Sequence, residues 1–383
     1  MEKREKIQRE ALALWLNSGK KGTLELITGL GKTKIAMDAV KLLPTRAKIL
    51  FLAETTTRKQ DMLVEQYKWG CAMYSIEFAC YQSAYKWKDT EWDLVIADEI
   101  HDSLTKEYSK FYANNKYESL LGLSATVDRR AMVDEEEAIL KGHLLDELCP
   151  VVYKYSMDDG QVDGTARELD VYVINHELDS TALTITGGSK DVPFLQTEKA
   201  AYDYRDEQFR KCMYLPEHIK NFRFRTTSAA RARLLYELPS KVDATKKLME
   251  SLPGKTIIFG NSIDSLEKIT DNVVSSRNTD AYNTELRAKF DAGKINVIAS
   301  FKKLKQGANL KGLDNVVIHS YYGKTKDLIQ RIGRLRQNGE VGRVFIFITF
   351  GTQEQKWFDG MWEDISITKI PCRSVEDCVS KIR

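Results

Sequence analysis

Apolar residues in this chain occur in short runs that alternate with amphipathic stretches. In the first third of the sequence such runs predict strands at 23–27, 48–53, 75–79, 93–97 and 117–123. Residues 34–43 and 59–69, between these runs, have helical spacing. A helix is also predicted over residues 2–17, with an apolar side formed by Ile7, Ala11, Leu14 and Trp15. Strands that alternate with helices predict an α/β fold with a mostly parallel sheet flanked by helices.

The same alternation returns in the second half of the chain. Strands are predicted at 151–155, 168–177, 255–259, 296–299, 315–319 and 344–350, and helices follow Ser262, start near Thr325 and close the pattern over 352–364. Residues 181–188 predict a hairpin or flap, and residues 195–238 look helical. A chain of 383 residues can bury two cores. We therefore expect domains at 1–149 and 150–383, the second with a hairpin and helical insertion at about 178–238.

A glycine-rich turn links the first predicted strand to the next helix. Its sequence is Thr28-Gly29-Leu30-Gly31-Lys32-Thr33. A strand, a tight turn and a helix start together form an anion cradle, because backbone N–H groups and the helix dipole converge there. Lys32 would reach the phosphates of a nucleotide, and the Thr33 hydroxyl would bind Mg²⁺. The full phosphate-loop pattern has a glycine where Leu26 stands, so an ordinary turn with a surface lysine is the alternative.

Two adjacent carboxylates follow the strand at 93–97. Asp98 and Glu99 begin the sequence Asp-Glu-Ile-His, which ends at His101. Carboxylates at the end of a buried strand are costly unless a positive charge meets them, and a magnesium–nucleotide complex supplies that charge. In this interpretation Asp98 holds the metal and Glu99 orients and activates the attacking water.

Other polar groups stand near these strand ends. Ser124 and Thr126, after the strand at 117–123, can hydrogen-bond to the turn that holds Asp98, although a simple turn is an equal explanation. Hydroxyls and an arginine after the strand at 48–53 suit phosphate contacts or plain helix capping; they are Thr55, Thr57 and Arg58. Gln8 carries an amide that could read an adenine edge, or it could be a solvated helix residue.

Basic residues gather in two parts of the second half. Residues 302–343 are rich in lysine and arginine, which fits either a solvated surface or phosphate binding. In residues 195–238 basic side chains are interleaved with Phe222 and Phe224. That pattern fits a nucleic-acid surface, or equally a solvated helix face with two core phenylalanines.

Composition narrows the class of protein. The net charge is only +3, so a nucleic-acid partner would have to be held by a local groove. No apolar run approaches the length of a membrane span, and Met1–Glu10 lacks a signal-peptide core. The six cysteines are scattered, which favours free thiols over a zinc site. We expect a monomer without membrane contact in the cytoplasm, or in a host-cell cytoplasm if the chain is viral.

The motifs of this chain resemble those of the superfamily 2 helicases in their order and approximate spacing. They are T-G-L-G-K-T at 28–33, D-E-I-H at 98–101, S-A-T at 124–126, G-A-N-L at 307–310 and Q-R-I-G-R at 330–334. The chain looks like a compact member of the DEAH/DEXH group, and its G-A-N-L segment is similar to that of double-strand DNA translocases. The resemblance implies two RecA-like domains with ATP, accompanied by Mg²⁺, bound in the cleft between them.

The resemblance also implies roles for individual residues. Gln8 and the loop from Thr28 to Thr33 would bind ATP, with Thr33 and Asp98 on the metal and Lys32, Asp98, Glu99, Arg331 and Arg334 catalytic. The two arginines match the arginine fingers of the family, whose third arginine is replaced here by Gln337. Residues that would couple hydrolysis to movement are His101, Ser124, Thr126 and Gln330. Residues that would contact nucleic acid are Thr55, Thr57, Arg58, Asn261, Ser262, Ser300 and Lys302.

The resemblance leaves several functions open. We expect a nucleic-acid-dependent ATPase that translocates on DNA and unwinds or remodels it. The alternatives are a translocase on double-stranded or branched DNA without processive unwinding, an RNA helicase, and a binding module that no longer hydrolyses ATP. The intact Lys32, Asp98, Glu99 and Arg334 speak against the last of these.

Overall fold

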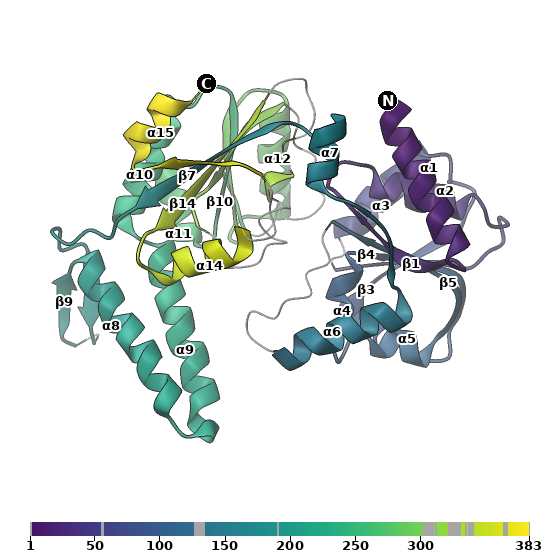
Figure 1. The fold of residues 1–383 in the computed structure, drawn as a ribbon, viewed down its shortest axis with the longest axis horizontal. Helices are drawn as coiled ribbons and strands as arrows, with labels where there is room; N and C mark the ends of the chain where they lie inside the picture. Colours follow the sequence, from purple (N-terminus) through teal and green to yellow (C-terminus); the bar gives the residue numbers. More distant parts are fainter. Residues whose placement is uncertain are drawn as a thin grey trace. The chain divides into compact units, whose positions relative to one another are not determined.

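The computed structural model describes residues 2–54, 57–125, 135–189, 191–301, 310, 312–320, 331–333, 335, 341–362 and 367–382. The chain divides into two compact units, Met1–Arg167 and Glu168–Arg383 (Figure 1). Each unit is an α/β fold around its own sheet. None of the helices in the described parts of the chain combines the length and apolar character needed to cross a membrane.

The first unit is built on a six-stranded sheet with the order β3-β2-β4-β5-β1-β6. Every neighbouring pair in it is parallel. Its strands are β1 (Lys21–Leu26), β2 (Ile49–Ala53), β3 (Ile76–Cys80), β4 (Glu91–Asp98), β5 (Lys116–Ser124) and β6 (Val151–Tyr155). The parallel arrangement brings the carboxyl ends of β4, β5 and β1, which are neighbours, to one edge of the sheet.

Helices cover both faces of this sheet. They are α1 (Glu2–Asn17), α2 (Lys32–Val40), α3 (Thr57–Lys68), α4 (Tyr81–Ala84), η1 (Ile100–Asp102), α5 (Lys110–Asn114), α6 (Glu135–Leu148) and α7 (Met157–Asp163). Side chains of α1, α2 and α3 form one apolar core with Leu94 and Ile96 of β4. Side chains of α4, α5 and α6 form a second core with Val95 and Ala97. Successive residues of a strand point to opposite faces, so a strand covered on both sides reads as a continuous apolar run.

The second unit contains a seven-stranded parallel sheet with the order β11-β12-β10-β13-β14-β7-β15. Its strands are β7 (Leu169–His176), β10 (Lys255–Gly260), β11 (Val273–Val274), β12 (Val297–Phe301), β13 (Leu313–Ile318), β14 (Gly342–Thr349) and β15 (Lys369–Cys372). Its helices outside the insertion are α10 (Pro239–Ser251), α11 (Ile263–Ile269), α12 (Asp280–Asp291), α14 (Gln353–Trp362) and α15 (Val375–Lys381). Residues of α10, α11 and α15 pack with Phe345 and Phe347 in one core.

A hairpin and two long helices lie between β7 and α10. The strands β8 (Ile185–Gly188) and β9 (Pro193–Gln196) pair antiparallel. The helices are α8 (Glu198–Lys211) and α9 (Glu217–Tyr236), joined by the short 3₁₀ helix η2 (Cys212–Tyr214). Figure 1 shows α8 and α9 side by side, projecting from the second unit. This element has its own small apolar core, which includes Tyr202 and Leu235.

Most strands lie where the sequence predicted them, but the structure differs in several places. The strand at 151–155 pairs with β1 of the first sheet, so the first unit extends to Arg167 and not to the expected residue 149. Leu14, expected on the apolar side of α1, is 38% exposed. Residues 181–184 are not part of the hairpin, which starts at Ile185. The helix at 353–362 is not the last element, because β15 and α15 follow it. The helix expected from Thr325 lies outside the described residues.

Candidate active site

The glycine turn after β1 is shaped to bind an anion. Gly29 and Gly31 have φ angles of 87° and 96°, a left-handed conformation that glycine adopts without strain. The second glycine is the N-cap of α2, and the first turn of that helix contains no acidic residue. The first N–H groups of a helix have no partner within it, and together with the helix dipole they favour a phosphate. A Cβ placed on Gly29 would meet no atom within 4 Å, so the turn faces open space at this point.

Gln8 reaches this turn from α1. Its side chain is 4% exposed, and its Nε2 donates a hydrogen bond to the carbonyl oxygen of Leu30 at 2.6 Å. A Cβ on Gly31 would lie 2.5 Å from the same Nε2 atom. The structure therefore brings together Gln8 and the loop that the sequence assigned to one nucleotide site, and the second glycine makes room for the glutamine.

Lys32 and Thr33 occupy the first turn of α2 and are partly exposed. The Lys32 Nζ atom donates a hydrogen bond to the carbonyl oxygen of Leu26 at 3.1 Å. This contact holds the ammonium group over the turn, near the helix N-terminus where phosphates would bind.

The two carboxylates lie where β4 ends. Asp98 is 7% exposed, and its Oδ2 accepts hydrogen bonds from Nη2 and Nε of Arg58 at 2.6 and 3.1 Å. The charge of Asp98 raises the pKa of the Arg58 guanidinium. The backbone oxygen of Asp98 accepts a hydrogen bond from the hydroxyl of Tyr81 at 2.8 Å. Arg58, which was expected to contact nucleic acid, is thus bound to the carboxylate that was expected to hold the metal.

Glu99 turns the chain away from β4 and contacts the end of β5. Its φ of 52° is unusual for a residue with a side chain and places it in the left-handed region. Its Oε2 lies 3.4 Å from both Ser124 Oγ and the backbone nitrogen of Ala125, which donate to it. Ser124 Oγ is also 3.0 Å from Nδ1 of His101. The hydroxyl of Ser124 therefore contacts the Asp-Glu-Ile-His turn, as the sequence suggested.

The residues at this edge fit ATP and Mg²⁺. Thr33 and Asp98 offer the oxygen ligands that Mg²⁺ prefers. No group of three His, Cys, Asp or Glu side chains in the described ranges could hold a metal alone. Magnesium in nucleotide sites is bound through one or two protein oxygens and the substrate phosphates, so a site without a full protein cage is what this chemistry needs.

Arg331 of the second unit is buried and structural. Its side chain is 1% exposed, Nη1 donates to the carbonyl oxygen of Ser320 at 3.0 Å, and Nη2 donates to Oδ1 of Asn261 at 3.1 Å. Its guanidinium also lies over the ring of Phe259, 5.5 Å from the centroid. An arginine finger must present its guanidinium outside its own domain. Arg331 instead ties together the ends of β10 and β13, so the finger role expected for it is not supported.

Two residues expected to contact nucleic acid are also buried in the second unit. Ser300, near the carboxyl end of β12, is 1% exposed. Ser262 is 7% exposed, caps α11 by accepting a hydrogen bond from the backbone nitrogen of Ser265, and donates to Glu237. Helix capping and burial thus explain both hydroxyls. Thr55, Thr126, Lys302, Gln330 and Arg334, and the side chain of Thr57, lie outside the described residues.

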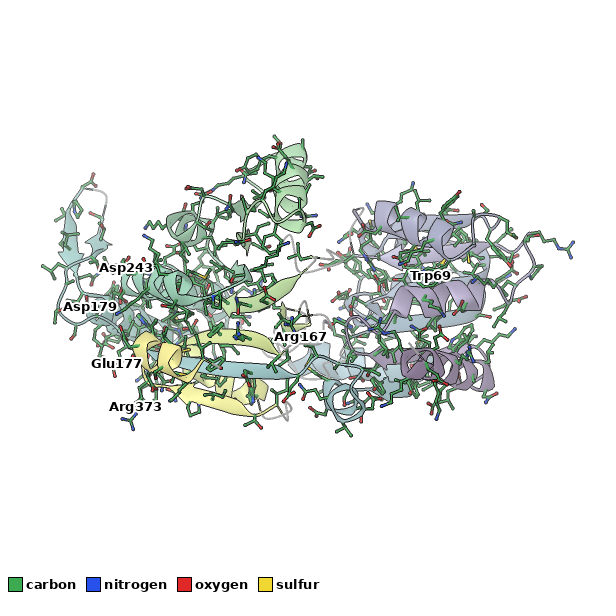
Figure 2. All side chains as sticks on the ribbon, turned by 90° about the horizontal axis from the view of Figure 1, so that it is seen from above. Trp69, Arg167, Glu177, Asp179, Asp243 and Arg373 are labelled. Atoms are coloured by element: carbon green, nitrogen blue, oxygen red, sulfur yellow. The ribbon has the colours of Figure 1, made fainter. Side chains whose placement is uncertain are left out.

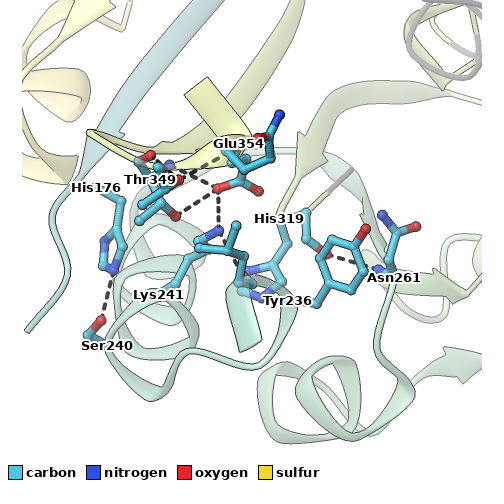
Figure 3. Close-up of polar contacts among 12 residues, drawn as sticks. His176, Tyr236, Ser240, Lys241, Asn261, His319, Thr349 and Glu354 are labelled. Carbon is cyan, nitrogen blue, oxygen red and sulfur yellow. Dashed lines mark hydrogen bonds and ion pairs between the residues drawn. The ribbon is translucent and has the colours of Figure 1, made fainter. Parts of the chain in front are cut away.

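A buried polar network that no sequence pattern indicated lies beside Asn261 (Figure 3). Lys241 and Glu354 are both fully buried and form an ion pair of 2.7 Å, and Glu354 also accepts hydrogen bonds from the backbone and hydroxyl of Thr349. Thr245 Oγ1, which donates to the carbonyl oxygen of Lys241, is 2.8 Å from Nδ1 of His319. Burial lowers the pKa of His319 to about 3. These residues are far apart in sequence, so only the fold reveals their pairing.

The sequence of this chain is similar to known helicase and translocase sequences. The model of the helicase conserved C-terminal domain matches residues 240–339. The DNA 3'-5' translocase XPB2 of Sulfurisphaera tokodaii is 22% identical over 377 residues, which covers 91% of this chain and 82% of that protein.

Two solved structures have a similar fold. The structure of S. cerevisiae Dbp5 bound to RNA and ADP BeF3 has a TM-score of 0.62 and 14% identity, covering 98% of this chain and 91% of that one. The helicase domain of Pyrococcus furiosus Hef has a TM-score of 0.54 and 15% identity, covering 92% and 97%. At these identities the likeness concerns the fold, and it spans both units.

Proposed function

Because the chain is a superfamily 2 helicase or translocase built from two RecA-like domains, we propose that it hydrolyses ATP at the glycine turn of the first unit to move along DNA. The observation that carries the proposal is the meeting of three motifs at one sheet edge. The turn follows β1, Asp98 and Glu99 follow β4, and Ser124 ends β5. The contact of Ser124 with both Glu99 and His101 joins two of these motifs directly.

The glycine turn binds the substrate. The N-terminus of α2 and the Lys32 ammonium would hold the β- and γ-phosphates, and Gln8 would hold the purine edge beside the Leu30 carbonyl. Mg²⁺, held by Thr33 and Asp98, would neutralise charge on the phosphates during transfer. Arg58 would then share the Asp98 carboxylate with the metal.

Glu99 is the proposed general base. Phosphoryl transfer needs a water molecule that is oriented in line with the γ-phosphate. The strained backbone at Glu99 and the hydrogen bonds from Ser124 and Ala125 fix the carboxylate in one position. A carboxylate held in this way accepts the proton of the water without a costly reorganisation.

The Ser124–His101 contact is the proposed coupling element. It links the end of β5 to the turn that carries the catalytic carboxylates. A change at Glu99 during hydrolysis would therefore reach β5 through a single hydroxyl. Thr126 and Gln330 belong to the same proposed coupling set through the family resemblance.

Arg334 is the proposed arginine finger. The finger role rests on the family resemblance, and the burial of Arg331 leaves Arg334 as the arginine of this motif to which the role is assigned. Arg331 then has a positioning role, because it fixes Asn261 and Ser320 at the ends of two strands. The remaining proposed contacts with the nucleic-acid backbone are Thr55, Thr57, Asn261 and Lys302.

DNA is the proposed track, with 3'-to-5' movement. The relative that matches most of the chain is named a DNA 3'-5' translocase. The test is the rate of phosphate release by the wild type with single-stranded, duplex and forked DNA and with the matching RNAs. Stimulation by DNA supports the proposal, whereas stimulation by RNA alone favours an RNA helicase. Absence of stimulation by any nucleic acid would favour a binding module without turnover. Triplex displacement without strand displacement would identify a translocase that does not unwind.

A further inference from the structure

The two helices between β9 and α10 pack through one face of α9. Phe224 packs against Phe209 of α8, with 4.9 Å between the ring centroids and a tilt of 48° between the ring planes. The Arg231 guanidinium lies 3.8 Å from the centroid of the same Phe209 ring, and Thr227 Oγ1 is 3.5 Å from Cys212 Sγ. Residues 224, 227 and 231 follow the spacing of a single helix face. This inner face of α9 is therefore covered by α8. We call α8, η2 and α9 together the arm.

The base of the arm is fixed to the second unit by buried polar contacts. Glu198 of α8 is fully buried and accepts hydrogen bonds from the backbone and hydroxyl of Ser240 at 2.9 and 2.6 Å. The same carboxylate accepts one from the backbone of Asp179, which follows β7 and is labelled in Figure 2. Arg231 donates to Gln353 of α14 at 3.1 Å. These contacts attach this end of the arm firmly to the second unit.

The outer end of the arm is unlike its base. Cys212 lies level with Thr227, so residues 213–226 form the end of the hairpin. Phe222 is 70% exposed and Tyr214 is 90% exposed, and Ile219 beside Phe222 is 41% exposed. Within the described residues Phe222 stacks on no other ring. We call Tyr214, Ile219, Phe222, Arg223 and Arg225 the arm-tip surface.

The arginines at this end have no acidic partner among the side chains that the structure describes. Arg223 follows Phe222 directly and Arg225 stands one helical turn after it, both are exposed, and neither forms an ion pair with any residue that the structure describes. No acidic residue occurs between Lys220 and Tyr236. By contrast, two arginines nearer the base are paired, Arg231 with Asp206 and Arg233 with Glu237 at 3.1 Å.

The structure also distinguishes the two explanations that the sequence left open for this segment. If both phenylalanines were core residues, both would be buried. Phe224 is in the packed inner face, but Phe222 is exposed to solvent, with Arg223 next to it in sequence and Arg225 one helical turn away. A single exposed aromatic residue is ordinary, but a cluster of exposed aromatic and apolar side chains beside free cationic groups marks a binding surface.

We propose that the arm-tip surface binds an unpaired stretch of nucleic acid, with Phe222 stacked on a base and Arg223 and Arg225 on phosphates. A base offers its flat face to an aromatic ring only where it is unpaired, and neighbouring cations then meet the backbone of the same strand. The inference deepens the proposed function and rests on it. It adds a second contact with the strand, remote in sequence from the proposed backbone-contacting residues, on an element fixed to the second unit.

Binding of whole protein to a fluorescent oligothymidine, measured by anisotropy without ATP over a range of salt concentrations, tests the proposal. F222A is expected to weaken binding roughly 10-fold, because stacking is worth that much for one base. F222W should keep binding within about 2-fold of the wild type, and F222L should behave like F222A. The double variant R223A/R225A should lower the salt slope by about 1.4, since each phosphate contact on a single strand contributes ~0.7.

Controls separate this proposal from the proposed function. K289A removes an exposed, paired lysine of α12 and should leave affinity unchanged. Photo-crosslinking of an oligonucleotide that contains 5-iodouracil should label the arm tip in the wild type and lose that label in F222A. Unchanged affinity and salt slope in F222A and R223A/R225A, with normal DNA-stimulated ATPase in the wild type, would overturn the arm proposal alone. Wild-type affinity in F222L would overturn the stacking role. If the wild type binds no nucleic acid, both proposals are wrong.

Discussion

Arg58 and Asp98 form the closest ion pair of the candidate active site, with 2.6 Å between Nη2 and Oδ2. Arg58 stands in the first turn of α3, and Asp98 is the last residue of β4. Both side chains are largely shielded from water, with 20% and 10% of their surface exposed. The pair therefore connects α3 to the carboxylate that we assign to the metal, and it gives Arg58 a structural role in the first unit.

R58A should destabilise the protein by about 1–3 kcal/mol, because Asp98 loses charged hydrogen bonds in a poorly hydrated position. Urea unfolding measures this loss. R58K should recover only part of the stability, since an ammonium group cannot reproduce the two guanidinium donors. The neighbouring exposed Lys59 provides a control, and K59A should leave the free energy of unfolding unchanged. Wild-type stability in R58A with weaker binding to nucleic acid would instead support the backbone contact that the sequence predicted.

Gly31 and Gln8 should be energetically coupled. G31A forces alanine into a φ of 96° and places its Cβ 2.5 Å from the Gln8 amide. G29A is the matched control, since Gly29 has a similar φ of 87° with no atom in the way. We expect G29A to cost about 1–2 kcal/mol of folding free energy through the backbone alone, and G31A to cost more. The double variant Q8A/G31A should lose less free energy of unfolding than the two single variants lose in total. Additive free energies of unfolding would contradict this contact.

The two arginines of the Q-R-I-G-R motif should behave differently. R331A should lower the free energy of unfolding by roughly 3 kcal/mol, because it removes a buried cation and leaves the Ser320 carbonyl and the Asn261 amide oxygen without their donor. R334A should fold normally and reduce ATP hydrolysis by about 10³-fold, the low end for an arginine finger. Equilibrium unfolding and phosphate release, measured on both variants, distinguish the roles. A stable R331A protein with lost hydrolysis would restore Arg331 as a finger.

Stability should fall in mildly acidic solution because His319 is buried and neutral. Burial lowers its pKa from 6.5 to about 3. Below pH 6.5 the unfolded chain therefore takes up a proton that the folded chain does not, and stability is lost as the pH falls toward 3. The expected loss from this residue is roughly 2 kcal/mol between pH 7 and pH 5. Burial lowers the pKa of His176 to about 3 as well, in the same direction.

Urea unfolding at pH 7 and pH 5 tests this expectation. H319N should reduce the difference between the two pH values, whatever it does to stability at pH 7. H143N is a control, because His143 is exposed on α6, where it pairs with Glu147. An unchanged pH dependence in H319N would show that His319 is not responsible.

Local patterns in the sequence predicted most strands and which polar residues meet at one edge of the first sheet, for a physical reason. A parallel strand covered on both faces is a continuous apolar run, and the polar residues that follow it must lie at the edge of the sheet. Asp98 after β4 and Gly29 after β1 could therefore be placed at the same edge from the sequence alone. Even the contact of Ser124 with the Asp98 turn followed from this logic.

Features set by long-range packing could not be predicted in the same way. The strand at 151–155 joins β1 because of pairing across the sheet, and nothing in its own residues marks the unit to which it belongs. A motif of two arginines does not reveal that Arg331 is buried. The sequence did contain a signal for the arm, since Phe222 and Phe224 are two positions apart on a helix and cannot share a face.

The central claim is that the first unit hydrolyses ATP with Glu99 as the base and Lys32 on the phosphates. Its most direct test is DNA-stimulated phosphate release by the wild type, K32A and E99Q, with ATP binding measured on the same samples. We predict that K32A neither binds nor hydrolyses ATP normally, and that E99Q binds ATP but hydrolyses it about 10²-fold more slowly or worse. Normal DNA-stimulated hydrolysis in E99Q would contradict the account.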